Sequence, residues 1–135
     1  MQKRFDNQHV VITGAARGIG FEIATQFARE GAVLSLLDFN EENLRKATTV
    51  LMENGATVYA YSIDVSNRQS VSEAINKADE IQPIDVLINN AGIAAETPFL
   101  NIEEAEWKQI IDINLTGMFF VAQSVCQKID RKSVV

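Results

Sequence analysis

The 135-residue sequence is poor in the residues that build disulfide scaffolds and metal centres. It contains one cysteine, Cys126, and one histidine, His9, so an internal disulfide and a histidine-based metal site are both excluded. Basic residues are also in the minority, because 12 Lys and Arg face 18 Asp and Glu and leave a net charge of −6. Nucleic acids and anionic membrane surfaces attract basic faces, so neither is an expected partner.

Long apolar runs are absent as well. The longest run, residues 118–122, is far too short to cross a bilayer, which takes about 20 apolar residues. Positive charges near the N-terminus are not followed by an apolar stretch, so no signal peptide is expected. With 47% hydrophobic and 22% charged residues, the chain can form a core. We therefore expect one cytoplasmic globular domain over residues 1–135.

Apolar periodicity alternates along the chain between the repeat of a strand and the repeat of a helix. Short β-branched or apolar runs predict strands at residues 9–13, 33–37, 57–63 and 84–89. Helices are expected between them, with these capping signals: Gly31 and Gly55 at C-termini, Asn40 at an N-terminus, and capping boxes at Ser66/Gln69 and Asn101/Glu104. Strands that alternate with helices indicate βαβ units, and therefore an α/β fold with a doubly wound parallel sheet.

The C-terminal third predicts a long helical stretch, with a break, from about residue 101 to about residue 129. Its apolar face is broad enough for either a core or an interface, and Cys126 is expected to pack there as a small apolar residue. Residues 132–135 resemble the start of another strand. We therefore expect a sheet that is truncated after its fourth strand and the long helix.

The most informative segment is the glycine-rich stretch at residues 13–20, TGAARGIG, between a predicted strand and a predicted helix. Gly14 allows a tight turn, Gly18 allows a phosphate to approach the backbone, and Gly20 allows close packing of the helix. The N-terminus of the helix offers unpaired N–H groups to a pyrophosphate. This context predicts a Rossmann-type dinucleotide-binding domain.

Asp38 ends the second predicted strand, eighteen residues beyond Gly20, where a Rossmann domain places the acid that binds the adenosine ribose. Its carboxylate would accept hydrogen bonds from the ribose hydroxyls and repel a 2′-phosphate, so NAD is expected rather than NADP. Arg17 favours the opposite choice, because a guanidinium in this loop could reach a 2′-phosphate. We interpret Arg17 as an exposed loop residue and retain NAD.

Three further signals occur in order: Asp64-Val65 after the third strand, Asn89-Asn90-Ala91-Gly92 after the fourth, and Asn114 within the long helix. Together with the glycine-rich stretch, they resemble the short-chain dehydrogenase/reductase family over essentially the whole chain. The resemblance implies an oxidoreductase that transfers hydride between NAD(H) and a small alcohol or carbonyl substrate. It also implies a homo-oligomer with the long helix in a subunit interface.

The resemblance assigns roles to individual residues. Asp64 corresponds to the acid that binds the adenine amino group, with the Val65 backbone beside it. Asn114 corresponds to the catalytic asparagine that holds a water in a proton relay to the active-site lysine. The cofactor-binding set is Gly14, Arg17, Gly18, Ile19, Gly20, Asp38, Asp64, Val65, Asn90, Ala91 and Gly92.

The tyrosine, lysine and serine that perform the chemistry in this family have no counterpart here. Tyr59 and Tyr61 are followed four residues later by Ile63 and Val65 rather than by lysine. The 135-residue chain alone is therefore expected to be inactive. One alternative is a truncated, non-catalytic fragment that binds a dinucleotide or associates with itself. Another is an extended relative such as a nucleotide-sugar epimerase, which the glycine spacing and the Asn-Asn-Ala-Gly segment disfavour.

Overall fold

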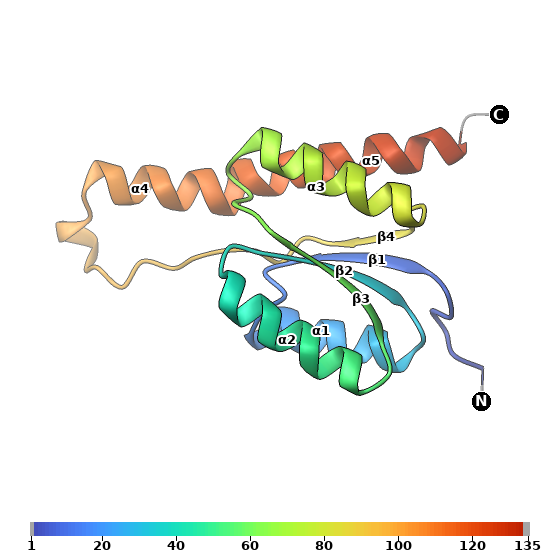
Figure 1. Ribbon diagram of the computed structural model, residues 1–135. Coiled ribbons are helices and arrows are strands. Elements are labelled where there is room, and N and C mark those ends of the chain that lie inside the picture. Colours follow the sequence, from blue (N-terminus) through green and yellow to red (C-terminus); the bar gives the residue numbers. More distant parts are fainter. Residues whose placement is uncertain (1, 134–135) are drawn as a thin grey trace.

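A computed structural model describes the backbone of residues 2–133 and the side chains of residues 2–130. It has a parallel sheet with helices on both faces (Figure 1). The strands are β1 (His9–Thr13), β2 (Val33–Asp38), β3 (Thr57–Ser62) and β4 (Val86–Ile88). The α-helices are α1 (Gly18–Arg29), α2 (Glu41–Glu53), α3 (Arg68–Ile81), α4 (Glu104–Ile111) and α5 (Met118–Ser133).

The strand order is β3-β2-β1-β4, and each neighbouring pair is parallel. The chain therefore moves outward from β1 through β2 to β3, and then crosses to the other side of β1 to form β4. The predicted doubly wound parallel sheet is confirmed for these four strands. The C-terminal ends of β1 and β4 lie at the point where the strand order reverses, which is where open α/β sheets form their ligand crevice.

Each face of the sheet has its own core because side chains alternate along a strand. Val10 and Ile12 of β1 pack on the face that α1 and α2 cover, whereas Val11 packs on the face that α3 and α5 cover. All five residues of β1 are buried. His9 begins the strand, and its ring nitrogens lie 2.6 Å from the Gln82 carbonyl and 2.8 Å from the Ser35 hydroxyl. These hydrogen-bond distances fit a structural role for His9.

Two predicted capping boxes were wrong. Asn67 caps α3, because its Oδ1 accepts from the Ser70 amide at 3.0 Å. Ser66 instead donates from its amide and its hydroxyl to the Asp64 carboxylate, so it belongs to the turn that precedes the capping residue. Asn101 lies in a 3₁₀ turn, Phe99–Asn101, and α4 starts at Glu104 without a side-chain cap.

The long helix is continuous from α4 to α5 through a π-helical segment, Asp112–Gly117, which is the predicted break. Over Glu104–Asp130 the helix is long and apolar enough to cross a membrane by length and composition, with 17% of its most apolar window buried. Our search for uninterrupted apolar runs missed this. Helices of folded domains pass the same test, and this one packs Val121 and Val125 beside α3.

Two expectations about the end of the chain need correction. Helix α5 continues to Ser133, so Lys132 and Ser133 are helical rather than the start of a strand; once formed, a helix gains one hydrogen bond with each added residue. Val134 and Val135 lie outside the described residues. Cys126 is exposed rather than packed, because the stripe that meets α3 runs through Val121 and Val125.

Candidate functional site

The glycine-rich loop leaves β1 at Thr13 and turns sharply at Gly14, whose φ is +63°. The Gly14 amide donates to the Leu37 carbonyl at 2.8 Å, so the loop begins against the end of β2. A Cβ on Gly20 would lie 2.1 Å from the Gly14 carbonyl oxygen. Only glycine therefore allows the first turn of α1 to approach the loop this closely.

Gly18 is the opposite case. Its φ is +56°, and a Cβ built there would meet no atom within 4 Å. The loop backbone is therefore open to solvent at this point, as expected where a phosphate is to approach. Ile19, the next residue, is also exposed.

The N-terminus of α1 is free to receive an anion. Arg17 occupies the cap position in an extended conformation and forms no side-chain capping hydrogen bond, and the first turn holds no acidic residue. The first amides of a helix have no partner within the helix and carry about half a positive charge. The open loop and the uncapped helix thus fit a pyrophosphate group.

Thr13 joins the loop to the segment after β4, although our sequence analysis assigned it no role. Its buried hydroxyl oxygen accepts from the amides of Asn90 and Ala91, both at 2.9 Å. In return, the Asn90 Nδ2 donates to the carbonyls of Thr13 and Gly14, at 3.2 and 3.1 Å. The predicted residues Gly14, Asn90 and Ala91 are therefore brought together across the sheet switch point.

Asp38 lies at the edge of the same loop. Its carboxylate accepts from the Ala16 amide at 3.0 Å and from the Asn40 amide at 2.9 Å. These bonds hold the acid beside the glycine-rich stretch, as the sequence predicts. A cavity of about 280 Å³ lies between α1 and α2, and its lining residues are Ala16, Arg17, Phe21, Asn43, Lys46, Ala47 and Val50.

Asp64 and Val65 lie between β3 and α3, and Val65 contacts the long helix. The Asp64 Oδ1 accepts from the amide and the hydroxyl of Ser66, at 2.9 and 2.6 Å. Val65 packs against Gly117 of the π-helical segment, where a Cβ would lie 2.7 Å from the Val65 Cγ2. Gly117 is a positioning residue that the sequence analysis missed, because nothing local marks the close approach. The adenine-binding role of Asp64 stays a prediction.

Asn114 projects from the π-helical segment toward the chain that follows β4. Its Oδ1 accepts from the Ile93 amide at 2.8 Å, and its Nδ2 donates to the Ile93 carbonyl at 2.7 Å. Oδ1 also lies 3.3 Å from where a Cβ on Gly92 would be. Asn114 therefore has the amide partners that its position in an apolar helix requires. Its place in a proton relay stays a prediction.

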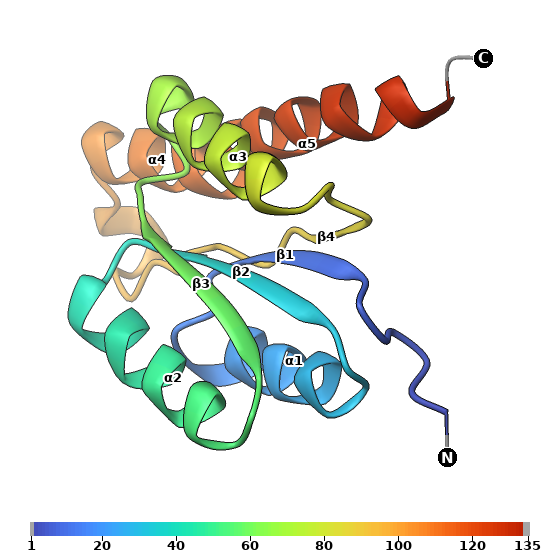
Figure 2. The ribbon, with the colours of Figure 1, turned by 45° about the vertical axis from the view of Figure 1, so that its right-hand side comes forward.

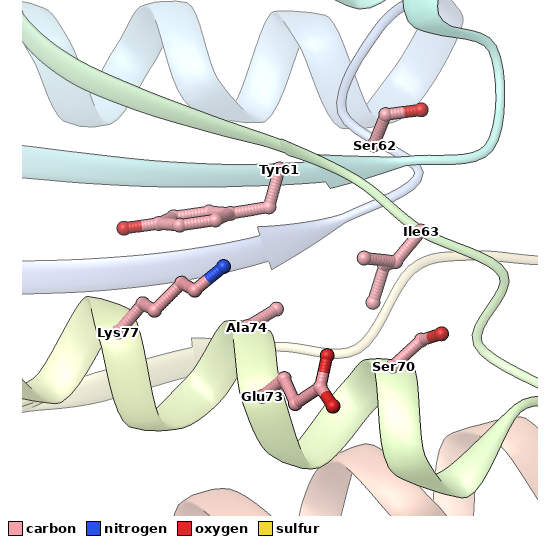
Figure 3. A pocket seen from close by; sticks show the side chains of 7 residues that line it. All are labelled: Tyr61, Ser62, Ile63, Ser70, Glu73, Ala74 and Lys77. Atoms are coloured by element: carbon pink, nitrogen blue, oxygen red, sulfur yellow. The ribbon is translucent and has the colours of Figure 1, made fainter.

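A second cavity, of about 270 Å³, lies between β3 and α3 on the face away from α1 and α2 (Figure 3). Tyr61 lines it, with Lys77 of α3 across the gap. Burial raises the pKa of Tyr61, and a hydrogen bond from Ser35 opposes this only in part. The phenol therefore stays protonated at neutral pH and does not fit the role of the missing catalytic tyrosine.

Comparisons with known proteins agree with this geometry. The family model for short chain dehydrogenase matches residues 8–134. The chain is 35% identical over 128 residues to 5-keto-D-gluconate 5-reductase of Escherichia coli (strain K12), which covers 93% of this chain and 50% of that protein.

Solved structures are similar as well. An NAD⁺-bound xylitol dehydrogenase matches with a TM-score of 0.91 and 31% identity, over 96% of this chain and 51% of that one. L-Sorbose reductase from Gluconobacter frateurii, complexed with NADPH and L-sorbose, matches with a TM-score of 0.89 and 25% identity, over 98% and 51%. The chain spans about half the length of the relatives it matches.

Proposed function

Because the chain belongs to the short-chain dehydrogenase family, we propose that it is the cofactor-binding part of an oxidoreductase. The complete enzyme would transfer hydride between a nicotinamide dinucleotide and an alcohol or carbonyl group of a small molecule. The observation that carries the proposal is the open loop at Gly18, which is followed directly by the uncapped N-terminus of α1. This arrangement suits a pyrophosphate.

The proposal divides the work among the residues of this chain. The backbone amides of residues 17–19 would hold the pyrophosphate, with Arg17 at the loop rim, because the Gly14, Ala15 and Ala16 amides already donate to Leu37 and Asp38. Asn90, Ala91 and Gly92 would line the cofactor from the far side of the switch point, and Asp64 and Val65 would contact the adenine. Asn114 would position a water for proton transfer. The bound nicotinamide would donate or accept the hydride.

We propose NAD as the preferred cofactor. Both Asp38 oxygens are anchored by backbone amides, so this negative charge is fixed beside the loop and would repel a 2′-phosphate. Arg17 and Lys46, which line the adjacent cavity, oppose this preference. Lys46 is already paired with Glu42 at 2.9 Å, which weakens its attraction for a phosphate.

The test is to titrate NAD and NADP against the wild type and Asp38→Ala. NAD affinity should fall about tenfold to a hundredfold, because a hydrogen bond to a charged group contributes about 1.5–3 kcal/mol. NADP affinity should fall less or rise. Glu53→Ala, which removes an acid at the far end of α2, should change neither. Equal losses for both cofactors would remove Asp38 from the discrimination, and absence of NAD binding by the wild type would overturn the proposal.

A non-catalytic, self-associating chain is the second candidate. Phe99, Leu100, Trp107, Leu115 and Phe119 are each more than half exposed, and surfaces of this kind favour association. We also propose homo-oligomers through this face and a cytoplasmic location, which the acidic composition and the exposed thiol of Cys126 support. Turnover by the purified chain, absent in our expectation, separates this candidate from an active enzyme.

A further inference from the structure

Phe39 differs from the other aromatic residues of the first two thirds of the chain. Its side chain is 79% exposed. The other aromatic residues before residue 92 are all partly buried: Phe5, Phe21, Phe27, Tyr59 and Tyr61. Single exposed apolar residues are common on protein surfaces, so the meaning of this one depends on its surroundings. Phe39 directly follows Asp38, at the carboxyl edge of the sheet where the candidate site lies.

Hydrogen bonds hold the backbone on both sides of Phe39. The Asp38 carbonyl accepts from the Ile63 amide at 3.0 Å, and the Asp38 Oδ1 accepts from the Asn40 amide at 2.9 Å. The Asn40 Oδ1 accepts in turn from the Asn43 amide at 2.8 Å and caps α2. Phe39 is therefore held in place before a ligand arrives, and a contact made by a preorganised residue costs less entropy on binding.

Phe39 also lies beside the end of β3. Because β2 and β3 are parallel and Asp38 is paired with Ser62, Phe39 is level with Ile63 and one residue short of Asp64. Neighbouring strands are about 4.8 Å apart. Figure 2 shows that the two strands end side by side, and that the chain then diverges into α2 on one face of the sheet and α3 on the other. Phe39 therefore lies next to Asp38 and about one strand away from Asp64.

The proposed function brings a base to this edge. An acid at the end of the second strand of a Rossmann domain binds the hydroxyls of the adenosine ribose, which is the role proposed for Asp38. The ribose carries the pyrophosphate at C5′ and the adenine at C1′, so the two groups leave it in different directions. With the pyrophosphate at the open loop around Gly18, the base extends away from the loop, toward the ends of β2 and β3.

We propose that the ring of Phe39 stacks on the adenine of the bound dinucleotide. The contact rests on the proposed function, because it requires the ribose at Asp38. Every base has a π-face, and stacking on an aromatic side chain typically strengthens binding about tenfold or more per base. Both NAD and NADP carry the adenine, so the loss of this ring should weaken both equally, unlike the loss of the Asp38 carboxylate.

Titration with ADP-ribose, which lacks only the nicotinamide ring of NAD, tests the contact by calorimetry. Phe39→Ala should weaken binding about tenfold, whereas Phe39→Trp, with a larger ring, should bind at least as tightly as the wild type. Phe99→Ala is the matched control and should leave the affinity unchanged, because it removes the same ring from a position beyond β4 that is 84% exposed.

The outcomes of this titration separate the contact from the proposed function. If the wild type and Phe39→Ala bind ADP-ribose equally well, the stacking contact is wrong and the proposed function stands. If the wild type does not bind ADP-ribose, both are wrong.

Tryptophan fluorescence tests whether the ring itself touches the base. The chain has one tryptophan, Trp107, so Phe39→Trp in a Trp107→Phe background carries a single reporter. This reporter should lose emission as ADP-ribose binds, because a base that stacks on an indole quenches it. Phe99→Trp in the same background is the matched control and should keep its emission. Binding of ADP-ribose without any loss of emission from the Phe39→Trp protein would overturn the contact.

Discussion

Residues 10–84 and residues 92–116 use their apolar side chains in opposite ways. Apart from Val121 and Val125, every buried apolar side chain of the described molecule lies in the first region. None of the residues from 92 to 116, all of which are described, is buried. Leu100 is 91% exposed, whereas Leu36 is fully buried. The first region encodes its own core, and the second carries an apolar surface that residues 2–133 do not cover.

The second region is held by polar contacts and by Ile113, which packs against the core on the α3 and α5 face. Thr13 holds the segment after β4 through two amides, and Asn114 holds the next residues through the Ile93 backbone. This division fits a sheet switch point, where a rigid β1 loop and a more exposed neighbouring segment together form the site. The predictions below test that difference, from the largest effect to the smallest.

Leucine-to-alanine substitutions should separate the regions most clearly. Leu36→Ala is expected to lower the free energy of unfolding by about 3 kcal/mol, because it removes buried methyl groups and leaves a cavity. Leu100→Ala should change it by no more than about 0.5 kcal/mol, since the side chain is already in water. Urea denaturation of both variants measures the difference. Similar losses would mean that Leu100 is covered in solution and would contradict the contrast.

Thr13→Val tests the connection between the β1 loop and the segment after β4. Valine has the shape of threonine but leaves the amides of Asn90 and Ala91 without their acceptor, which is expected to cost about 2 kcal/mol. NAD affinity should fall with it. Thr25→Val is the matched control, because that hydroxyl only donates to the Phe21 carbonyl within α1. A Thr13→Val protein as stable as the Thr25→Val protein would show that the Thr13 hydrogen bonds contribute little to the free energy of unfolding.

Glu30→Gln tests an exposed contact between the first region and the N-terminal segment. Hydrogen bonds from the backbone and then the side chain of Arg4 lower the pKa of Glu30 below its ordinary value of 4.5. A carboxylate with a lowered folded pKa stabilises the fold above its unfolded pKa, and this stabilisation is lost as the pH falls through the folded value.

The melting temperature of Glu30→Gln should therefore lie slightly below that of the wild type at pH 7, and the two should converge as the pH falls below about 4.5. Melting curves between pH 3 and pH 7 measure this, with Glu53→Gln as the control. A difference that persists at pH 3 would show that the carboxylate charge is not its cause.

Much of the fold and part of the site were predictable from local signals. The strand periodicity, the Asn40 cap and the glycines with positive φ at Gly14, Gly31 and Gly55 are all found in the structure. Each depends on interactions within a few residues. The wrong capping boxes at Ser66 and Asn101 show the limit of such signals, because Asn67 caps α3 in place of Ser66 and Asn101 belongs to a 3₁₀ turn that ends before α4.

Contacts between distant parts of the chain decide three features of the structure. These are the order of the strands, which residues meet at the switch point, and whether each apolar side chain is buried. Thr13 bonds residues 77 and 78 positions away, and Gly117 accommodates Val65, which lies far earlier in the chain. Short-range sterics and the periodicity of the sequence determine where a glycine-rich turn or an apolar stripe forms. Whether that turn faces Asn90, or that stripe faces a core, is decided only when the chain packs, because packing selects one partner among many with equally suitable chemistry.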